Sequence, residues 1–305
     1  MSAPPLDAAT ERRILLPFVC VTLIWGSTWL VIHTQLGLVP PMWSVTYRFT
    51  LGALAMFGVA AATRQGLRIG APAQAVAVAV GLLTFTLNYN SVYAAEGFVP
   101  SGLVAVMFAL LVPSNALLAR VFLGQQLSRP FLLGSGVAML GVALLFVHEL
   151  RGGGEDAHQT AIGLGFGALA ILGASIGNVL QGGAAARAAP VASLLAWSMT
   201  WGAGFDALLA WVVTGPPRFD WHVGYVAGLL YLGIAASALA FTLYFTLIRA
   251  IGPARAGYIN VLVPVIAMLL STLFERYRWS VEAVAGGGIV LVGLVVAMRA
   301  RSPAR

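Results

Sequence analysis

The sequence predicts an all-α membrane protein with ten transmembrane helices arranged as two inverted five-helix repeats. Three observations predict this fold. Of the 305 residues, 60% are apolar and only 9% are charged, whereas average soluble domains carry roughly 25% charged residues. The apolar runs are long and continuous, and short motifs recur in the same order in both halves of the chain. A soluble domain or a disordered chain needs more polar residues, and a β-barrel needs alternating ones.

A spanning helix needs about 20 residues, so the chain has room for about ten spans. Prolines and glycines separate the apolar runs, as at Pro40-Pro41 and Gly215-Pro216. The expected spans are 14–36, 40–62, 73–95, 100–123, 130–148, 161–183, 191–214, 222–250, 253–275 and 279–298. We therefore expect five segments: a cytoplasmic tail (1–13), a first repeat (14–148), a connecting loop (149–160), a second repeat (161–299) and a cytoplasmic tail (300–305).

The arginines predict the orientation. The formal net charge is +7, and all 17 basic residues are arginines. With the N-terminus inside, four arginines lie outside, Arg48 lies within a span, and the remaining twelve lie at the inner side, as the positive-inside rule requires. They are Arg12, Arg13, Arg64, Arg68, Arg120, Arg129, Arg187, Arg249, Arg255, Arg299, Arg301 and Arg305. We expect a multi-pass protein of the bacterial inner (plasma) membrane with both termini in the cytoplasm, and no nucleic-acid partner.

The two halves of the chain share motifs at a nearly constant spacing. The Leu-Val-Pro sequence that ends at Pro113 recurs 151 residues later at Pro264, and Tyr93 and Tyr244 have the same spacing. The segment 136–141 matches the segment 288–293, 152 residues later. Five spans per copy is an odd number, so the second copy must enter the membrane from the opposite side. Inverted repeats are typical of secondary transporters, with the binding site near the midplane between the repeats.

An ordered set of motifs resembles those of one transporter family. The first span contains Trp25-Gly26-Ser27, the second contains Arg48-Phe49, and the fourth ends in Leu-Gly-Gln-Gln-Leu at 123–127. In this order, and over about residues 14–299, the chain resembles the EamA family of the drug/metabolite transporter superfamily, in which the last motif usually reads Leu-Gly-Glu-Arg-Leu. Gln125 replaces the glutamate here, and only the second copy keeps Glu275-Arg276. The resemblance implies a ten-helix carrier, often an exporter of amino acids or related metabolites.

Two charged residues lie inside predicted spans, where burial of a charge costs at least about 2.5–3.5 kcal/mol. Arg48 lies roughly 10 Å and Asp206 roughly 12 Å inside the outer boundary, at 1.5 Å per residue. Three interpretations of Arg48 remain open: an ion pair with Asp206, a cap on a helix end or carbonyl, or a bidentate contact with a substrate carboxylate. Asp206 is a candidate proton-coupling residue or a structural partner of Arg48.

Neutral polar side chains concentrate in spans one, three, four, six, eight and nine. Without water, such groups need partners, so they face protein or a cavity. We predict a wet cavity that binds a small-molecule substrate; hydrogen bonding between helices is the alternative interpretation for any single side chain. The candidate binding residues are Trp25, Thr28, Arg48, Asn88, Tyr93, Asn115, Asn178, Tyr244, Tyr258 and Asn260. Pro113 and Pro264 are candidate hinges, because proline removes a helix hydrogen bond.

Other classes find less support in the sequence. The pattern Gly173-Ala-Ser175-Ile-Gly177 fits the G-x-S-x-G motif but lies in a predicted helical span rich in glycine, and we interpret it as helix packing. A membrane enzyme and a passive channel are the alternative functions, but the chain has no recognisable catalytic, filter, zinc-binding or P-loop motif. We therefore expect a secondary transporter that exports by alternating access in the lipid bilayer, is not an enzyme, and uses no cofactor or metal. The sequence gives no signal for an oligomeric state.

Overall fold

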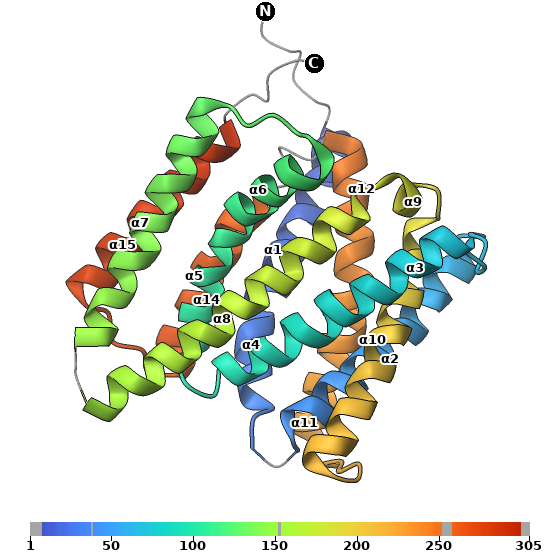
Figure 1. Cartoon of the computed structure of the whole chain (residues 1–305), viewed down its shortest axis with the longest axis horizontal. Coiled ribbons are helices and arrows are strands. Elements are labelled where there is room, and N and C mark those ends of the chain that lie inside the picture. Colours follow the sequence, from blue (N-terminus) through green and yellow to red (C-terminus); the bar gives the residue numbers. More distant parts are fainter. Residues whose placement is uncertain (1–7, 38, 152–153, 252–257, 300–305) are drawn as a thin grey trace, which may run out of the picture.

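A computed structural model describes residues 8–37, 39–151, 154–251 and 258–299 (Figure 1). This part of the chain is all helical, without a strand. The first half contains α1 (Ala8–Thr34), α2 (Pro41–Ala62), α3 (Ala71–Val80), η1 (Gly81–Asn88), α4 (Tyr89–Ala95), α5 (Ser101–Met107), η2 (Phe108–Leu110), α6 (Leu111–Leu123) and α7 (Arg129–Arg151). The second half contains α8 (Gly154–Gln181), α9 (Ala184–Arg187), α10 (Val191–Thr214), α11 (Val223–Leu230), η3 (Tyr231–Leu239), α12 (Ala240–Ile251), α14 (Ile259–Phe274) and α15 (Val281–Arg299).

Among the described residues, eight helices are long and apolar enough to cross a membrane. They correspond to all the predicted spans except 191–214 and 253–275. The span 191–214 is the helix α10, which carries several polar residues including Asp206. The span 253–275 contains α14, whose 16 residues make a helix of about 24 Å, shorter than a hydrocarbon core of about 30 Å. The chain is therefore a multi-pass membrane protein, and the described residues do not confirm the predicted number of ten spans.

The segment 149–160, which we expected to form a connecting loop, is mostly helical. Helix α7 continues to Arg151 and α8 begins at Gly154. Both helices extend beyond their apolar runs, because polar residues at the end of a helix can also adopt helical geometry. The predicted tails 1–13 and 300–305 lie mostly or wholly outside the described residues.

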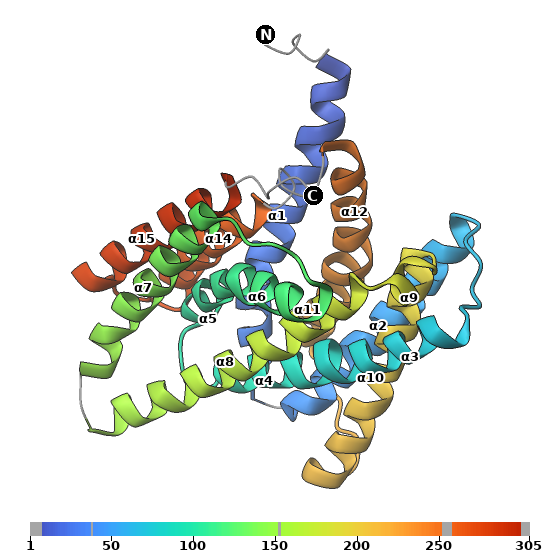
Figure 2. The same cartoon turned by 45° about the horizontal axis from the view of Figure 1, so that its top comes forward.

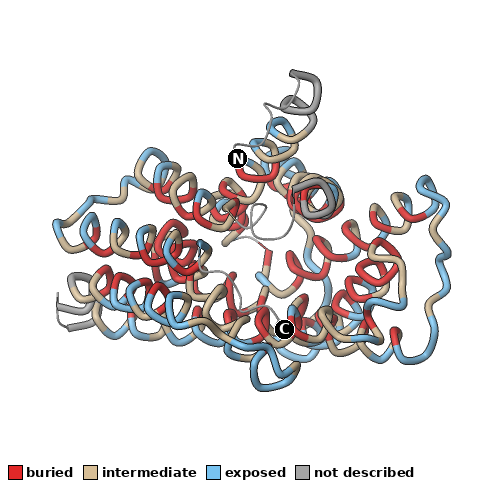
Figure 3. The backbone as a smooth tube through the Cα atoms, turned by 90° about the horizontal axis from the view of Figure 1, so that it is seen from above, coloured by how far each residue is buried: buried red, intermediate tan, exposed pale blue. Residues whose placement is uncertain are grey.

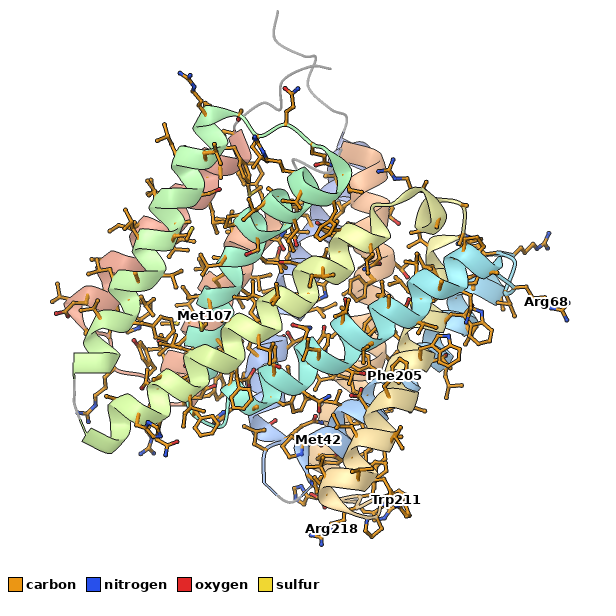
Figure 4. The ribbon with its side chains drawn as sticks, viewed as in Figure 1. Met42, Arg68, Met107, Phe205, Trp211 and Arg218 are labelled. Atoms are coloured by element: carbon orange, nitrogen blue, oxygen red, sulfur yellow. The ribbon has the colours of Figure 1, made fainter. Side chains whose placement is uncertain are left out.

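The outer surface of the bundle is apolar, whereas polar side chains gather inside it. Leu133, Val212 and Leu140 are about 70% exposed on the surfaces of their helices. Seen from above, buried stretches of backbone lie toward the interior and exposed stretches along the periphery (Figure 3). Two exposed arginines, Arg68 and Arg218, point away from the bundle at opposite ends of the α2–α10 pair (Figure 4). This distribution suits a bundle that is surrounded by lipid.

The third and eighth predicted spans each contain a π-helical segment, which the sequence does not reveal. These segments, η1 and η3, begin 150 residues apart, at Gly81 and Tyr231. Each segment is crossed closely by another helix: a Cβ on Gly81 would meet Gly202 N of α10 at 2.9 Å, and one on Gly233 would meet Arg48 O of α2 at 3.1 Å. A widened helix turn at such a crossing is typical of functional regions.

Helices α7 and α15 lie side by side along one edge of the bundle (Figures 1 and 2). The contacts run in opposite order along the two helices, so the pair packs antiparallel. They join Gly134 to Ala297, Ala138 to Gly293, Gly141 to Val290 and Leu145 to Gly286. Gly134 and Gly286 are equivalent positions at the 152-residue spacing, and each contacts the other helix's backbone. The pair is therefore nearly two-fold symmetric.

Candidate functional site

The structure contains a cavity of about 530 Å³ between the two halves of the chain. Helix α8 forms one wall and runs beside α6, α4 and η1 (Figures 1 and 2). Helices α1, α12 and α14 contribute the facing wall, and α1 packs against both of the others. The polar and aromatic lining residues are Trp25, Thr28, Trp29, Arg48, Thr84, Asn88, Tyr89, Phe108, Asn115, Asn178, Gln181, Phe241, Tyr244 and Asn260.

Eight of the ten predicted binding residues lie in this lining: Trp25, Thr28, Arg48, Asn88, Asn115, Asn178, Tyr244 and Asn260. Tyr93 and Tyr258 do not line the cavity, and neither does Asp206. Of the two predicted hinges, Pro264 lines the cavity and Pro113 does not. The structure thus brings together residues from spans one, two, three, four, six, eight and nine.

Aromatic rings form two groups in the cavity wall. The ring of Trp25 lies 5.0 Å from that of Tyr244 and 5.4 Å from that of Phe241, and its indole nitrogen donates to the carbonyl of Ala236 at 3.2 Å. Trp29 packs edge-on against Phe108, with ring centroids 4.9 Å apart. Such rings provide rigid apolar surface with a polar edge, which suits a solute that has an apolar portion.

Arg48 is the one charged residue among the lining residues, and only 2% of its surface is exposed. Its guanidinium lies over the ring of Tyr89, 4.5 Å from the centroid, and 5.3 Å from the centroid of Phe49. Among the described residues, Nε and Nη1 have no hydrogen-bond partner. Cation–π contacts stabilise a cation by about 2 kcal/mol or more when it is desolvated, which is less than a buried charge loses by leaving water. Arg48 therefore still lacks a counterion in this cavity.

The ion pair between Arg48 and Asp206, one of the interpretations left open by the sequence, is absent from the described residues. Asp206 is fully buried, and its Oδ1 accepts a hydrogen bond from Asn90 Nδ2 at 2.6 Å. Arg48 is not among the groups that interact with Asp206. Arg48 and Asp206 lie at similar depths in the membrane, but similar depth does not make two side chains face each other. Depth is the only signal for this pair in the sequence.

Amide side chains form a further part of the cavity wall. Asn178 Nδ2 donates to Asn115 Oδ1 at 3.4 Å, so α8 and α6 are linked across the wall. Tyr244 and Asn260 form a second side-chain hydrogen bond, between α12 and α14. Asn88 donates to the carbonyl of Thr84 at 3.1 Å, but its Oδ1 has no partner. This wall offers both donors and acceptors to a polar solute.

The cavity is accessible from one end and closed at the other. At the accessible end, Asn178 is exposed, and Gln181 and Gly182 are half-buried. At the other end, the lining residues Ile32 and Val92 are both 2% exposed. The structure therefore has the cavity open toward the side on which α8 ends.

A buried polar network lies beyond the closed end. The hydroxyl of Tyr93 donates to Gln35 Oε1 at 3.2 Å, and Gln35 Nε2 donates to the carbonyl of Tyr225 at 3.4 Å. The hydroxyls of Tyr225 and Ser44 lie 2.9 Å apart. These bonds link α1, α2, α4 and α11, so Tyr93 contributes to the closure rather than to the lining. Gln35 was not predicted, because a single amide near the end of an apolar run carries no specific signal.

The retained glutamate of the second repeat also lies at a helix end. Glu275 accepts hydrogen bonds from the backbone nitrogen of Ser101 at 3.0 Å, from the Ser101 hydroxyl, and from Ser271 Oγ at 2.9 Å. It thereby satisfies the first turn of α5 in the first half of the chain, where an acidic group is favourable. Gln125, which replaces the glutamate in the first repeat, is exposed. Glu275 therefore connects the two halves of the chain, and the first half carries Gln125 where the resemblance predicts the equivalent glutamate.

The two predicted hinge prolines occupy different surroundings. Pro113 lies in the first turn of α6, directly after the 3₁₀ segment η2 that separates α5 from α6. Pro264 lies inside the uninterrupted helix α14 and is buried. Only the first position therefore coincides with a break in the α-helix, as expected where a proline removes a backbone donor.

We expect Pro113→Ala to slow transport several-fold without changing the apparent affinity for the solute. Alanine restores a backbone N–H and favours continuation of α5 into α6, which stiffens the break at η2. Initial rates and half-saturation concentrations in proteoliposomes measure the two effects separately. Pro264→Ala is the comparison, because α14 is already continuous; equal rates for wild type and Pro113→Ala would contradict a hinge at η2.

Gly173 and Gly177 of the sixth span pack against another helix, as interpreted from the sequence. A Cβ on Gly173 would meet the carbonyl of Leu83 at 2.7 Å, and Gly177 faces the side chain of Thr84, so η1 and α8 approach closely. Ser175, between them, is fully buried within the helix α8. The G-x-S-x-G match thus lies in a helix, without the strand-to-helix elbow that this motif requires.

Comparisons with known proteins agree with this architecture. Residues 12–147 and 161–299 each match the EamA-like transporter family. The uncharacterized transporter YoaV of Bacillus subtilis is 22% identical over 288 residues, covering 92% of this chain and 95% of YoaV. The uncharacterized inner membrane transporter YedA of Escherichia coli K12 is 26% identical over 285 residues, covering 89% and 88%. A crystal structure with 20% identity superposes with a TM-score of 0.65 over 92% of this chain and 95% of that one. The chain belongs to the EamA-like transporter family and is a membrane transporter.

Proposed function

We propose that this protein is a secondary carrier that exports a small metabolite, an amino acid or a related compound, by alternating access. The observation that carries the proposal is Arg48: a buried guanidinium without a counterion, in the wall of a cavity that is accessible from one end only. Arginine binds a carboxylate through two parallel hydrogen bonds, and the aromatic rings and amides beside it suit the remainder of such a solute.

Alternating access requires two related halves of opposite orientation, and we propose ten spanning helices in two inverted repeats, at about 14–148 and 161–299. Three features support this proposal. The family matches twice, once in each half. The fifth helices, α7 and α15, are equivalent in sequence and pack antiparallel. The π-helical segments η1 and η3 occur at equivalent positions.

We also propose that both termini lie in the cytoplasm of a bacterium and that the protein spans its inner membrane. The distribution of the arginines supports this orientation. In this orientation Asn178 and Gln181 lie at the cytoplasmic end of α8, so the accessible end of the cavity faces the cytoplasm. A cytoplasm-facing cavity is the state that loads a solute for export. The coupling role of Asp206 stays a prediction.

Transport in proteoliposomes tests the proposal. Candidate solutes come from metabolite profiles of cells that lack or overproduce the protein, and the panel includes amino acids together with their decarboxylated amines. We expect saturable counterflow of a carboxylate-bearing compound and none of its amine. Arg68→Gln, which changes an exposed arginine, is the control variant and should transport normally. Flux that does not saturate and shows no counterflow would indicate a channel and overturn the proposal.

A further inference from the structure

A second buried ionisable group, Glu96, interacts electrostatically with Arg48. Glu96 directly follows α4, one residue beyond the apolar span Ala71–Ala95, and it is 2% exposed. Neither of its carboxylate oxygens has a hydrogen-bond partner in the part of the chain that the structure describes. Glu96 does not line the cavity, whereas its neighbour Arg48 does. The sequence pattern does not mark Glu96 as a candidate, because it lies at the end of a span rather than inside one.

Glu96 interacts electrostatically with two charged groups, Arg48 of α2 and Glu275 at the end of α14. On its own helix, Tyr93 interacts with both Arg48 and Glu96. The other elements that pack against α4 are η1 and α8. The segment η1 has no titratable residue, and the described titratable side chain of α8, His158, is exposed. The surroundings of Glu96 therefore contain one cation and one competing carboxylate.

Glu275 does not need the cation, because its oxygens already accept three hydrogen bonds from Ser101 and Ser271. Glu96 accepts no such hydrogen bonds from the described residues. A buried carboxylate without hydrogen bonds loses several kcal/mol of hydration free energy and regains little of it. Burial raises the pKa of Glu96 well above its ordinary value, Glu275 raises it further, and Arg48 lowers it. The arrangement in the structure therefore fits a neutral, protonated Glu96.

With Glu96 neutral, Arg48 has no counterion, and its Nε and Nη1 are unpartnered. Two anionic groups can supply one. The first is a solute carboxylate in the cavity, and the second is the side chain of Glu96 after loss of its proton. A single guanidinium in a site without water cannot satisfy both at once, because the two carboxylates repel each other at low dielectric.

We propose that Glu96 is a proton-binding site and that its carboxylate, once it has lost its proton, is the internal counterion of Arg48 in place of an anionic solute. The link to transport rests on the proposed function: a carboxylate-bearing solute binds Arg48 while Glu96 is protonated, and loss of that proton lets the Glu96 carboxylate displace the solute. The site then changes from Arg⁺ with the solute carboxylate and a neutral Glu to Arg⁺ with Glu⁻, so one anion faces Arg48 in either state and the solute and one proton leave together. The proton and the solute then cross the membrane in the same direction.

Asp206 offers a matched comparison. It is also a buried carboxyl group with one unpartnered oxygen, Oδ2. Its other oxygen accepts a hydrogen bond from Asn90, it does not line the cavity, and Arg48 is not among its interacting groups. If Glu96 is the site, its titration depends on Arg48 and that of Asp206 does not.

Infrared spectroscopy of the full-length protein in lipid nanodiscs, without any solute, tests the site independently of transport. The carbonyl stretch of a protonated carboxylic acid is followed as pH is raised, in wild type, Glu96→Gln, Asp206→Asn and Arg48→Gln. We expect a component of this band at neutral pH that is lost at alkaline pH, is missing in Glu96→Gln and is retained in Asp206→Asn. Because an adjacent cation lowers a carboxyl pKa by about 1–3 units, Arg48→Gln should move the loss of this band upward by that amount.

Each other result overturns the inference. A band that Asp206→Asn removes and Glu96→Gln retains assigns the proton to Asp206. A band that persists at every pH at which wild type stays folded describes a carboxyl group that never releases its proton. An unchanged titration in Arg48→Gln separates Glu96 from Arg48. The proposed function fails separately, through absence of counterflow in proteoliposomes, and that failure leaves the infrared titration intact.

Discussion

Replacing Arg48 with Gln is expected to lower the apparent affinity for a carboxylate-bearing solute between about thirtyfold and several thousandfold. Truncating one partner of a buried charged pair costs about 2–5 kcal/mol, and each 1.4 kcal/mol is tenfold in affinity. The guanidinium is 2% exposed and lies in the cavity wall, so water cannot replace it. The measurement is the half-saturation concentration for counterflow in proteoliposomes, with the compound identified by the solute panel.

Two further variants separate charge from geometry. Arg48→Lys keeps the positive charge but loses the planar pair of donors and the stacking over Tyr89, so we expect only partial recovery. Arg68→Gln removes an exposed arginine far from the cavity and should leave the affinity unchanged. Folding should survive in Arg48→Gln, because Glu96 then stays neutral beside it. Wild-type affinity in Arg48→Gln, with normal purification, would place the solute elsewhere.

The sequence predicts the cavity well because membranes enforce a simple rule. A polar side chain in a span must face protein or water, so amides and tyrosines in apolar runs mark the interior. This rule found Asn88, Asn115, Asn178 and Asn260, all of which line the cavity. It failed for Tyr93 because a tyrosine satisfied by a neighbour, here Gln35, looks the same in sequence as one that faces a cavity.

Other features of the site have no counterpart in sequence pattern. Phe108 and Phe241 line the cavity, but an aromatic residue in an apolar run faces lipid, core or cavity with equal plausibility. The π-helical segments coincide with close crossings at Gly81 and Gly233, and these crossings depend on the partner helix. Which carboxyl group interacts with Arg48 depends on rotation of the helices about their axes, so depth suggested Asp206, whereas in the structure Glu96 is the carboxyl group that interacts electrostatically with Arg48.

Adding one methyl group at Gly286 is expected to lower the melting temperature of the protein clearly, whereas the same change at Gly287 is not. A Cβ on Gly286 would meet the backbone of α7, 2.6 Å from Leu145 N and 2.7 Å from Gly141 O, and a backbone cannot rotate away as a side chain can. A Cβ on Gly287 meets nothing within 4 Å. Overpacking costs about 1–3 kcal/mol, while Ala in place of Gly in a helix gains up to about 1 kcal/mol.

The near two-fold symmetry of the α7–α15 pair makes this comparison repeatable on the other helix. Gly134 is equivalent to Gly286 and would place its Cβ 2.7 Å from Gly293 O, whereas Gly136 has nothing within 4 Å. The melting temperatures of the four single variants are compared in one detergent. Gly286→Ala and Gly134→Ala, whose added methyl groups meet the partner helix, should both lose stability. Gly287→Ala and Gly136→Ala, whose methyl groups meet nothing, should match or exceed wild type. Loss of stability in all four, or in none, would mean that these helices do not pack through their glycine faces, and the antiparallel pairing that supports the inverted repeats would lose its basis.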